Sequence, residues 1–160
     1  MDTFIQRRLE FLIAEANAGE RQRQDISMVM RVVSNYATLG LNAASHRIKQ
    51  LNRRVSREAY ELLLRAKDFD QWSKATINEH ELLLAEVWSR TPGLTPKTLW
   101  KIFVDHQLTT VTSDEDRNLP KSGERDAGIE VSWLEQTPRE IYETLRVNNS
   151  EYERRKDRSL

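Results

Sequence analysis

A regular spacing of apolar residues in the first half of the chain sets the strongest limit on its fold. From residue 42 to residue 69 an apolar side chain recurs every three or four positions, as on a helix with one buried face. Its members are Ala44, Ile48, Leu51, Val55, Ala59, Leu62, Ala66 and Phe69. Ser56 could begin a new helix, but the spacing crosses it unchanged. The pattern therefore predicts one helix over 42–69, about 40 Å long at a rise of about 1.5 Å per residue.

Two shorter helices are predicted before this stripe. The first covers 2–18, where Gly19 can end it and the apolar positions are Ile5, Leu9, Leu12 and Ala16. The second begins near Asp25, a good N-cap residue, and ends at Gly40. Residues 1–72 then form an antiparallel helical bundle. Because the eight-residue stripe exceeds what two short helices can cover, it also predicts a homodimer.

The part from residue 73 onward is predicted to mix helices with two short strands. The segments TINE at 76–79 and TPRE at 137–140 each fit a capping box at a helix start. Thr95 and Pro96 suit the first positions of another helix. The segments LTTVT at 108–112 and IEVSWL at 129–134 are short and β-branched, which is typical of strands. The predicted fold is mainly α: a helical bundle over 1–72, then over 73–160 a small α+β unit with a two-stranded sheet and a C-terminal helix. The two parts can pack as one domain.

Composition excludes several classes of protein. No apolar run approaches the roughly 18 residues of a membrane span, and two arginines interrupt what would be the apolar segment of a signal peptide. The chain has no cysteine, which excludes disulfides, thiolate metal sites and thiol nucleophiles. Its five glycines form no phosphate-binding loop. A cytoplasmic protein without membrane contact or cofactor is therefore expected.

Charge is unevenly distributed although the net charge is zero. Residues 1–67 hold 12 Lys and Arg against 7 Asp and Glu, whereas residues 68–143 hold 8 against 15. A basic half of this kind predicts an acidic macromolecular partner, either nucleic acid or protein. The alternative is that the two halves pair with each other.

The basic residues concentrate in one stretch, HRIKQLNRRVSREAYELLLRAK at 46–67. Most of its arginines lie away from the apolar stripe, so a solvated helix face is one interpretation. The other is a binding surface formed by Arg47, Lys49, Gln50, Arg53, Arg54 and Arg57. A non-enzymatic helical accessory or regulatory protein that binds through these residues is the leading hypothesis.

Two arrangements in the sequence resemble DNA-binding motifs. The segment ATLGLNAASHRIKQLNRR resembles a helix-turn-helix, although His46 and Tyr36 replace the buried β-branched and small residues expected there. A helix-turn-helix regulator is therefore an alternative function. Helices at 76–90 and 95–106 followed by two strands resemble a winged helix. Its acidic wing, with Asp114 and Asp116, would oppose binding to phosphates.

The third hypothesis is a metal-dependent nuclease. His80 lies beside Glu79 in NEHE, and Asp114 and Asp116 lie in SDEDRN; these side chains suit a hard cation. No second histidine stands four residues after His80, and Glu79 already serves the predicted capping box. This makes a metal site the least favoured of the three.

The four tryptophans are predicted to divide between core and surface. Trp88, Trp100 and Trp133 are expected in the core of the second half, where a large apolar side chain is normally buried. Trp72 follows the predicted long helix and is expected at a partner interface.

Overall fold

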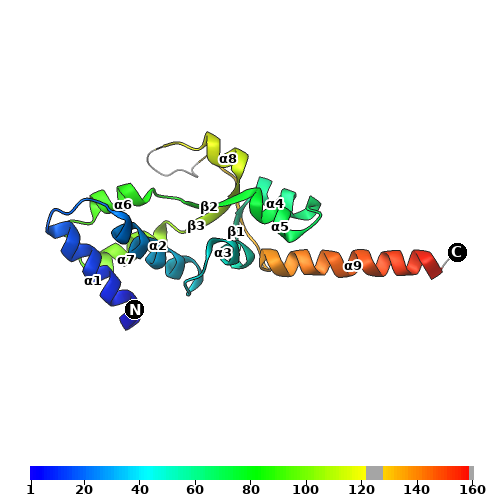
Figure 1. The fold of residues 1–160 in the computed structure, drawn as a ribbon, viewed down its shortest axis with the longest axis horizontal. Helices are drawn as coiled ribbons and strands as arrows, with labels where there is room; N and C mark the ends of the chain where they lie inside the picture. The colour runs from blue at the N-terminus through cyan, green and yellow to red at the C-terminus, as the bar shows by residue number, and fades with distance from the viewer. Residues whose placement is uncertain (122–127, 159–160) are drawn as a thin grey trace.

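The computed structural model describes residues 1–121 and 128–158, in which helices surround a four-stranded mixed sheet (Figure 1). The helices are α1 (Thr3–Asn17), α2 (Gln24–Leu39), α3 (Ser45–Leu51), α4 (Arg57–Arg65), α5 (Phe69–Lys74), α6 (Leu84–Arg90), α7 (Pro96–Asp105), α8 (Ser113–Asn118) and α9 (Pro138–Arg158). The strands are β1 (Arg54–Ser56), β2 (Thr76–His80), β3 (Leu108–Thr112) and β4 (Val131–Trp133).

The sheet has the order β2-β3-β1-β4. β3 runs antiparallel to β2 and parallel to β1, and β4 runs antiparallel to β1. Val55 at the centre of β1 lies opposite Thr110 on one side and Ser132 on the other. The two strands predicted from the sequence are present, but β1 lies between them. The predicted two-stranded sheet was therefore wrong, and the fold is α+β.

The predicted helix over 42–69 was also wrong, because the chain leaves the helical path after Leu51. Asn52 is buried, and its side chain donates to the Leu108 carbonyl at 3.1 Å and accepts from the Arg54 backbone N–H at 3.1 Å. The next residues form β1, whose backbone pairs with two strands. Ser56 then caps α4 by accepting from the Ala59 backbone N–H at 3.0 Å. Pairing with β3 and β4 therefore determines the conformation of residues 54–56, although the apolar spacing there is that of a helix.

The segment TINE forms strand β2, so its predicted capping box was wrong. Five residue pairs join β2 to β3. The Thr76 hydroxyl donates to the Trp72 carbonyl at 3.0 Å, and Glu79 is buried within the strand. The pattern of a capping box is only four residues long, and here pairing with a distant strand determines the conformation.

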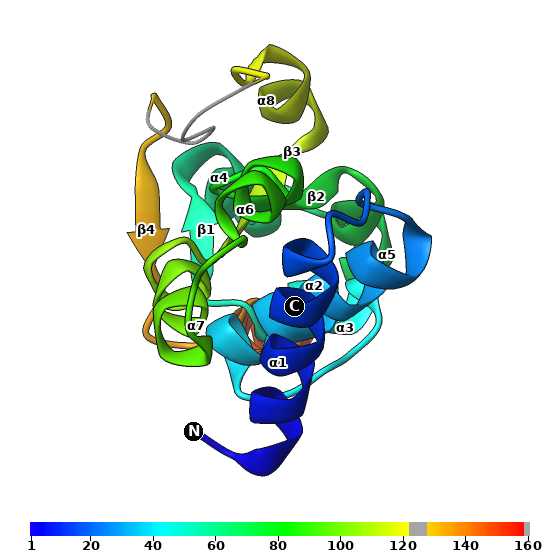
Figure 2. The ribbon, with the colours of Figure 1, turned by 90° about the vertical axis from the view of Figure 1, so that its left-hand side faces the viewer.

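Most of the apolar core lies where α1 and α2 pack on α6 and α7 (Figure 2). The predicted stripe of α1 is buried there, and Gly40 ends α2 with a positive φ of 71°, as expected. Because α6 and α7 contribute Val87, Leu99 and Phe103, this core draws on both sides of the boundary predicted at residue 72.

A second, smaller core joins α4, α5 and the start of α9. Leu63, Phe69 and Trp72 are its buried members. Several members of the stripe over 42–69 are buried within one chain, namely Ile48, Val55, Ala59 and Phe69. These four residues need no second copy to cover them, whereas Ala44, Leu51, Leu62 and Ala66 are not fully buried, so the homodimer stays a prediction.

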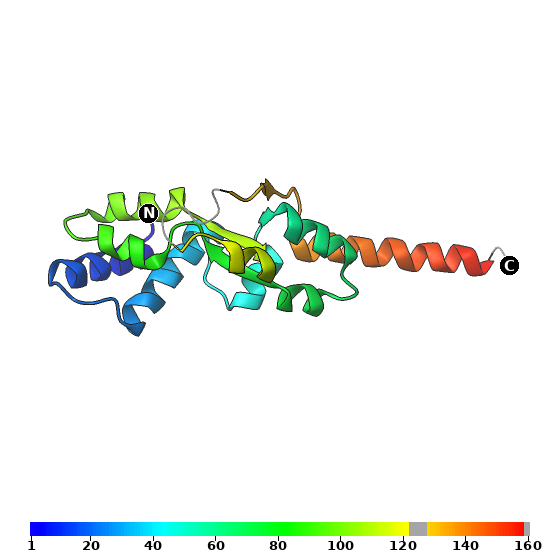
Figure 3. The same cartoon turned by 90° about the horizontal axis from the view of Figure 1, so that it is seen from above.

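The C-terminal helix α9 extends away from the rest of the molecule (Figures 1 and 3). Its predicted capping box is confirmed: Thr137 N–H donates to the Glu140 carboxylate at 2.9 Å, and Glu140 N–H donates to the Thr137 hydroxyl at 3.2 Å. Ile141 and Tyr142 pack on the second core. Neither α9 nor any other helix in the described ranges combines the length and apolarity needed to cross a bilayer.

Candidate nucleic-acid interface

The fold divides the basic stretch into buried, paired and exposed cations. Lys49 points from α3 toward the chain between α5 and β2, where its Nζ donates to the Ser73 carbonyl at 2.6 Å and the Thr76 carbonyl at 2.7 Å. Burial lowers the pKa of Lys49. These contacts give Lys49 a structural role, because they attach α3 to β2.

Replacing Lys49 by methionine is expected to lower the free energy of unfolding by about 2 kcal/mol, since two carbonyls lose a charged donor. Urea unfolding followed by circular dichroism measures the change. Lys97 is exposed on α7, so Lys97→Met provides the control and should leave stability unchanged. Equal stability of the two variants would contradict the structural role of Lys49.

Arg54 belongs to a cluster of partly buried charges at one end of the sheet. Its NH1 lies 3.0 Å from Glu81 Oε2, and His106 Nδ1 lies 3.2 Å from Glu81 Oε1. The side chains of Arg54, Glu81 and His106 are only 15%, 14% and 18% exposed. Arg54 therefore links β1 to Glu81, which follows β2. Through Glu81 it is also linked to His106, which precedes β3. Sequence reasoning missed Glu81 and His106, because residues distant in the chain give no local signal of a pair.

Arg57 is exposed but lies close to two carboxylates. It forms ion pairs with Glu61 at 3.1 Å and with Glu130 at 3.3 Å. These carboxylates raise the pKa of Arg57, Glu61 through the larger effect. Glu130 belongs to the acidic half of the chain, so at this position the two halves do pair with each other.

Arg47 and Arg53 differ from Lys49, Arg54 and Arg57, the other cations of the predicted binding surface. Both are exposed, and in the ranges that the structure describes neither forms an ion pair. Gln50 lies half-buried on α3 between them. Residues 41–57 contain no Asp or Glu. The candidate interface therefore reduces to Arg47, Gln50 and Arg53.

The tryptophans occupy positions different from those predicted. Trp72 is fully buried and donates its indole N–H to the Ala59 carbonyl at 2.8 Å, so it is not an interface residue. Trp88 and Trp100 are partly buried against the main core. Trp133 is 63% exposed on β4, where a core residue was expected. Strand alternation alone does not tell which face of an edge strand is covered.

The residues proposed as metal ligands do not converge. Glu79 and His80 are neighbours on β2, where strand geometry directs them to opposite faces, and His80 Nδ1 lies 3.2 Å from Ser34 Oγ. Asp114 and Asp116 lie on α8, which begins directly after Thr112. Thr112 pairs with Thr76, at the opposite end of β2 from His80. Within the described residues, no group of three or more His, Asp or Glu side chains could hold a metal ion.

Neither arrangement that resembles a DNA-binding motif has the geometry expected for it. The winged-helix order fails because residues 76–80 form a strand and because β1 separates β3 from β4. In the helix-turn-helix segment, α3 has seven residues and directs Lys49 inward. Of the predicted contact residues on this helix, Arg47 is exposed and Gln50 is half-buried.

Comparisons of the chain with protein-family models, with curated proteins and with solved structures found no match.

Proposed function

We propose that this is a non-enzymatic cytoplasmic accessory protein that binds nucleic acid through Arg47 and Arg53. The observation that carries the proposal is the absence of a counter-charge beside these two exposed cations within residues 41–57, which contain no Asp or Glu. Elsewhere in the same stretch, Arg54 and Arg57 are neutralised by carboxylates. An uncompensated cation gains most from contact with a phosphate, because binding releases the counterions condensed on the polyanion.

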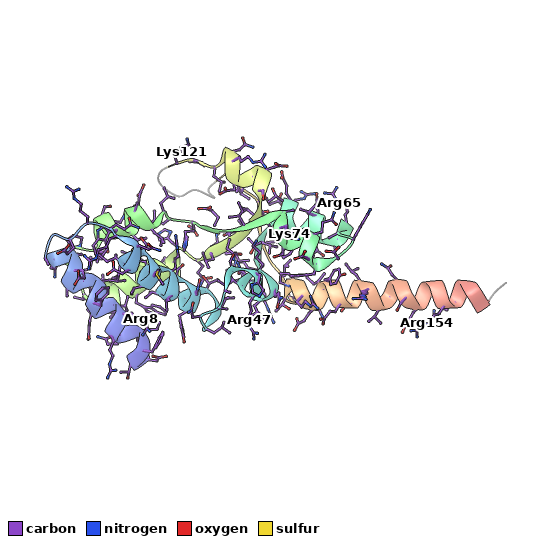
Figure 4. The ribbon with its side chains drawn as sticks, viewed as in Figure 1. Arg8, Arg47, Arg65, Lys74, Lys121 and Arg154 are labelled. Atoms are coloured by element: carbon purple, nitrogen blue, oxygen red, sulfur yellow. The ribbon has the colours of Figure 1, made fainter. Side chains whose placement is uncertain are left out.

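The distribution of other cations, of which Arg154 is exposed and Arg8 partly buried, favours a linear polyanion over a compact acidic protein. In Figure 4, Arg8, Arg47 and Arg154 follow one another along the lower side of the molecule, on α1, α3 and α9. α3 also contacts α9 directly. Separate cations spread along the length of the molecule match the regular charge of a nucleic-acid backbone better than they match a single acidic patch on a protein.

The decisive experiment reverses the two uncompensated charges. Arg47→Glu combined with Arg53→Glu should weaken binding to a labelled oligonucleotide at about 50 mM salt, and should reduce the slope of log affinity against log salt by about 2. Fluorescence anisotropy over a salt series measures both quantities. Circular dichroism should show unchanged helicity, since both side chains are exposed.

A matched control makes the same change of charge elsewhere. Arg65 and Lys67 are exposed at the end of α4 and form no ion pair in the described parts of the chain. Arg65→Glu with Lys67→Glu should leave most of the affinity and the salt slope intact. An equal loss in both double variants, or a wild-type protein that binds no nucleic acid at low salt, would overturn the proposal.

A further inference from the structure

Trp133 is the most exposed of the large apolar side chains among the described residues, at 63%. Burying a side chain of this size removes a large apolar surface from water. The fold instead leaves the indole in solvent, on the strand at one edge of the sheet. Tryptophan is enriched at contact surfaces, because it combines a large apolar ring with a polar N–H.

The backbone around Trp133 is held firmly. Three residue pairs join β4 to β1, with Trp133 directly opposite Arg54. On either side of the strand, Leu134 N–H donates to the Arg53 carbonyl at 2.9 Å and Arg57 N–H donates to the Glu130 carbonyl at 2.9 Å. A ligand that stacks on the ring would therefore not have to order this segment, which lowers the entropic cost of binding.

The charge beside Trp133 indicates the kind of ligand. The Arg54 guanidinium carbon lies 5.9 Å from the centre of the Trp133 ring, and Glu81 holds that guanidinium in place. The residue before it is Arg53, the uncompensated cation of the proposed interface. An exposed aromatic plane beside a basic segment suits a nucleotide strand, because a base can stack on the ring while a neighbouring phosphate meets Arg53.

We propose that Trp133 stacks on an unpaired base and that the protein binds single-stranded nucleic acid in preference to duplex. This inference rests on the proposed function and adds the class of nucleic acid to it. The faces of bases inside a duplex are covered by their neighbours, so only a single strand, a loop or an end can present a base to an exposed indole.

The test compares one oligonucleotide as a single strand and as a duplex of the same sequence. Trp133→Ala should weaken single-strand binding by about 5- to 150-fold, which corresponds to the stacking energy of one base. Trp133→Phe should retain most of the affinity, because phenylalanine still offers an aromatic face. Duplex binding should be weaker in the wild type and insensitive to either substitution.

Two further measurements distinguish stacking from other effects. The salt slope of Trp133→Ala should equal that of the wild type, because no phosphate contact is lost, and the single strand should quench tryptophan emission less in Trp133→Phe. Met28→Ala, at another exposed apolar side chain, is the control and should bind as the wild type does.

Base stacking and nucleic-acid binding as such are tested by different variants. If Trp133→Ala binds the single strand as tightly as the wild type while the Arg47 and Arg53 double variant loses binding, stacking is overturned and nucleic-acid binding stands. Equal wild-type affinity for single strand and duplex would also overturn the inference. A wild-type protein that binds neither form overturns both.

Discussion

Replacement of Trp72 by alanine is expected to lower the free energy of unfolding by about 3–5 kcal/mol, the usual range for a large buried aromatic residue. The ring is fully buried in the smaller core, 5.2 Å from the ring of Phe69 between ring centres. The substitution opens a cavity between α4 and α5, and it leaves the Ala59 carbonyl without the indole donor. Urea unfolding followed by circular dichroism measures the loss.

Trp133→Ala is the natural control, because it removes the same side chain from an exposed position. It should change stability by no more than about 0.5 kcal/mol. Trp72→Phe should fall between the two, since it fills part of the volume but cannot donate to the Ala59 carbonyl. If Trp72→Ala were no less stable than Trp133→Ala, the second core described for α4, α5 and α9 would be wrong.

Replacement of Glu81 by leucine is expected to destabilise the protein by about 3 kcal/mol, because it removes a carboxylate that pairs with the partly buried guanidinium of Arg54 and with His106. This is the low end of the range for buried pairs. We expect the low end because Arg54 and Glu81 retain 15% and 14% exposure, which allows water to screen the remaining charge. The midpoint and slope of urea unfolding give the value.

The double variant Arg54→Met with Glu81→Leu tests whether the charge itself causes this loss. It should be more stable than Glu81→Leu alone, since the partly buried guanidinium is removed together with the carboxylate that faces it. A double-mutant cycle should give a coupling energy of about 1–3 kcal/mol between the two residues. Additive effects would show that the residues act independently, contrary to the ion pair.

Elements specified by local interactions were predictable from the sequence. The stripe of α1, the glycine that ends α2, and the cap formed by Thr95 before Pro96 all occur as expected. The segment 108–112 forms a strand, and TPRE opens α9. In each case the decisive contacts join residues within a few positions of one another, or the periodicity of the segment indicates its buried face.

The candidate interface was only partly predictable. Charge and spacing indicated the region that contains Arg47 and Arg53, but they gave the same weight to Lys49, Arg54 and Arg57. The structure separates these side chains because their partners come from elsewhere: Thr76 for Lys49, Glu81 for Arg54 and Glu130 for Arg57. Such pairings depend on how distant segments meet.

The sequence by itself therefore determined the caps before α7 and α9, the glycine that ends α2, the apolar face of α1 and one central strand, because short-range hydrogen bonds and apolar periodicity suffice for them. Only the tertiary structure decided that residues 54–56 are a strand between β3 and β4, and that 76–80 pair with β3. A segment of three to five residues is too short to satisfy its own backbone groups as a helix, whereas flanking strands can satisfy them. Residues 54–56 and 76–80 form strands because neighbouring strands accept and donate the hydrogen bonds of their backbone groups.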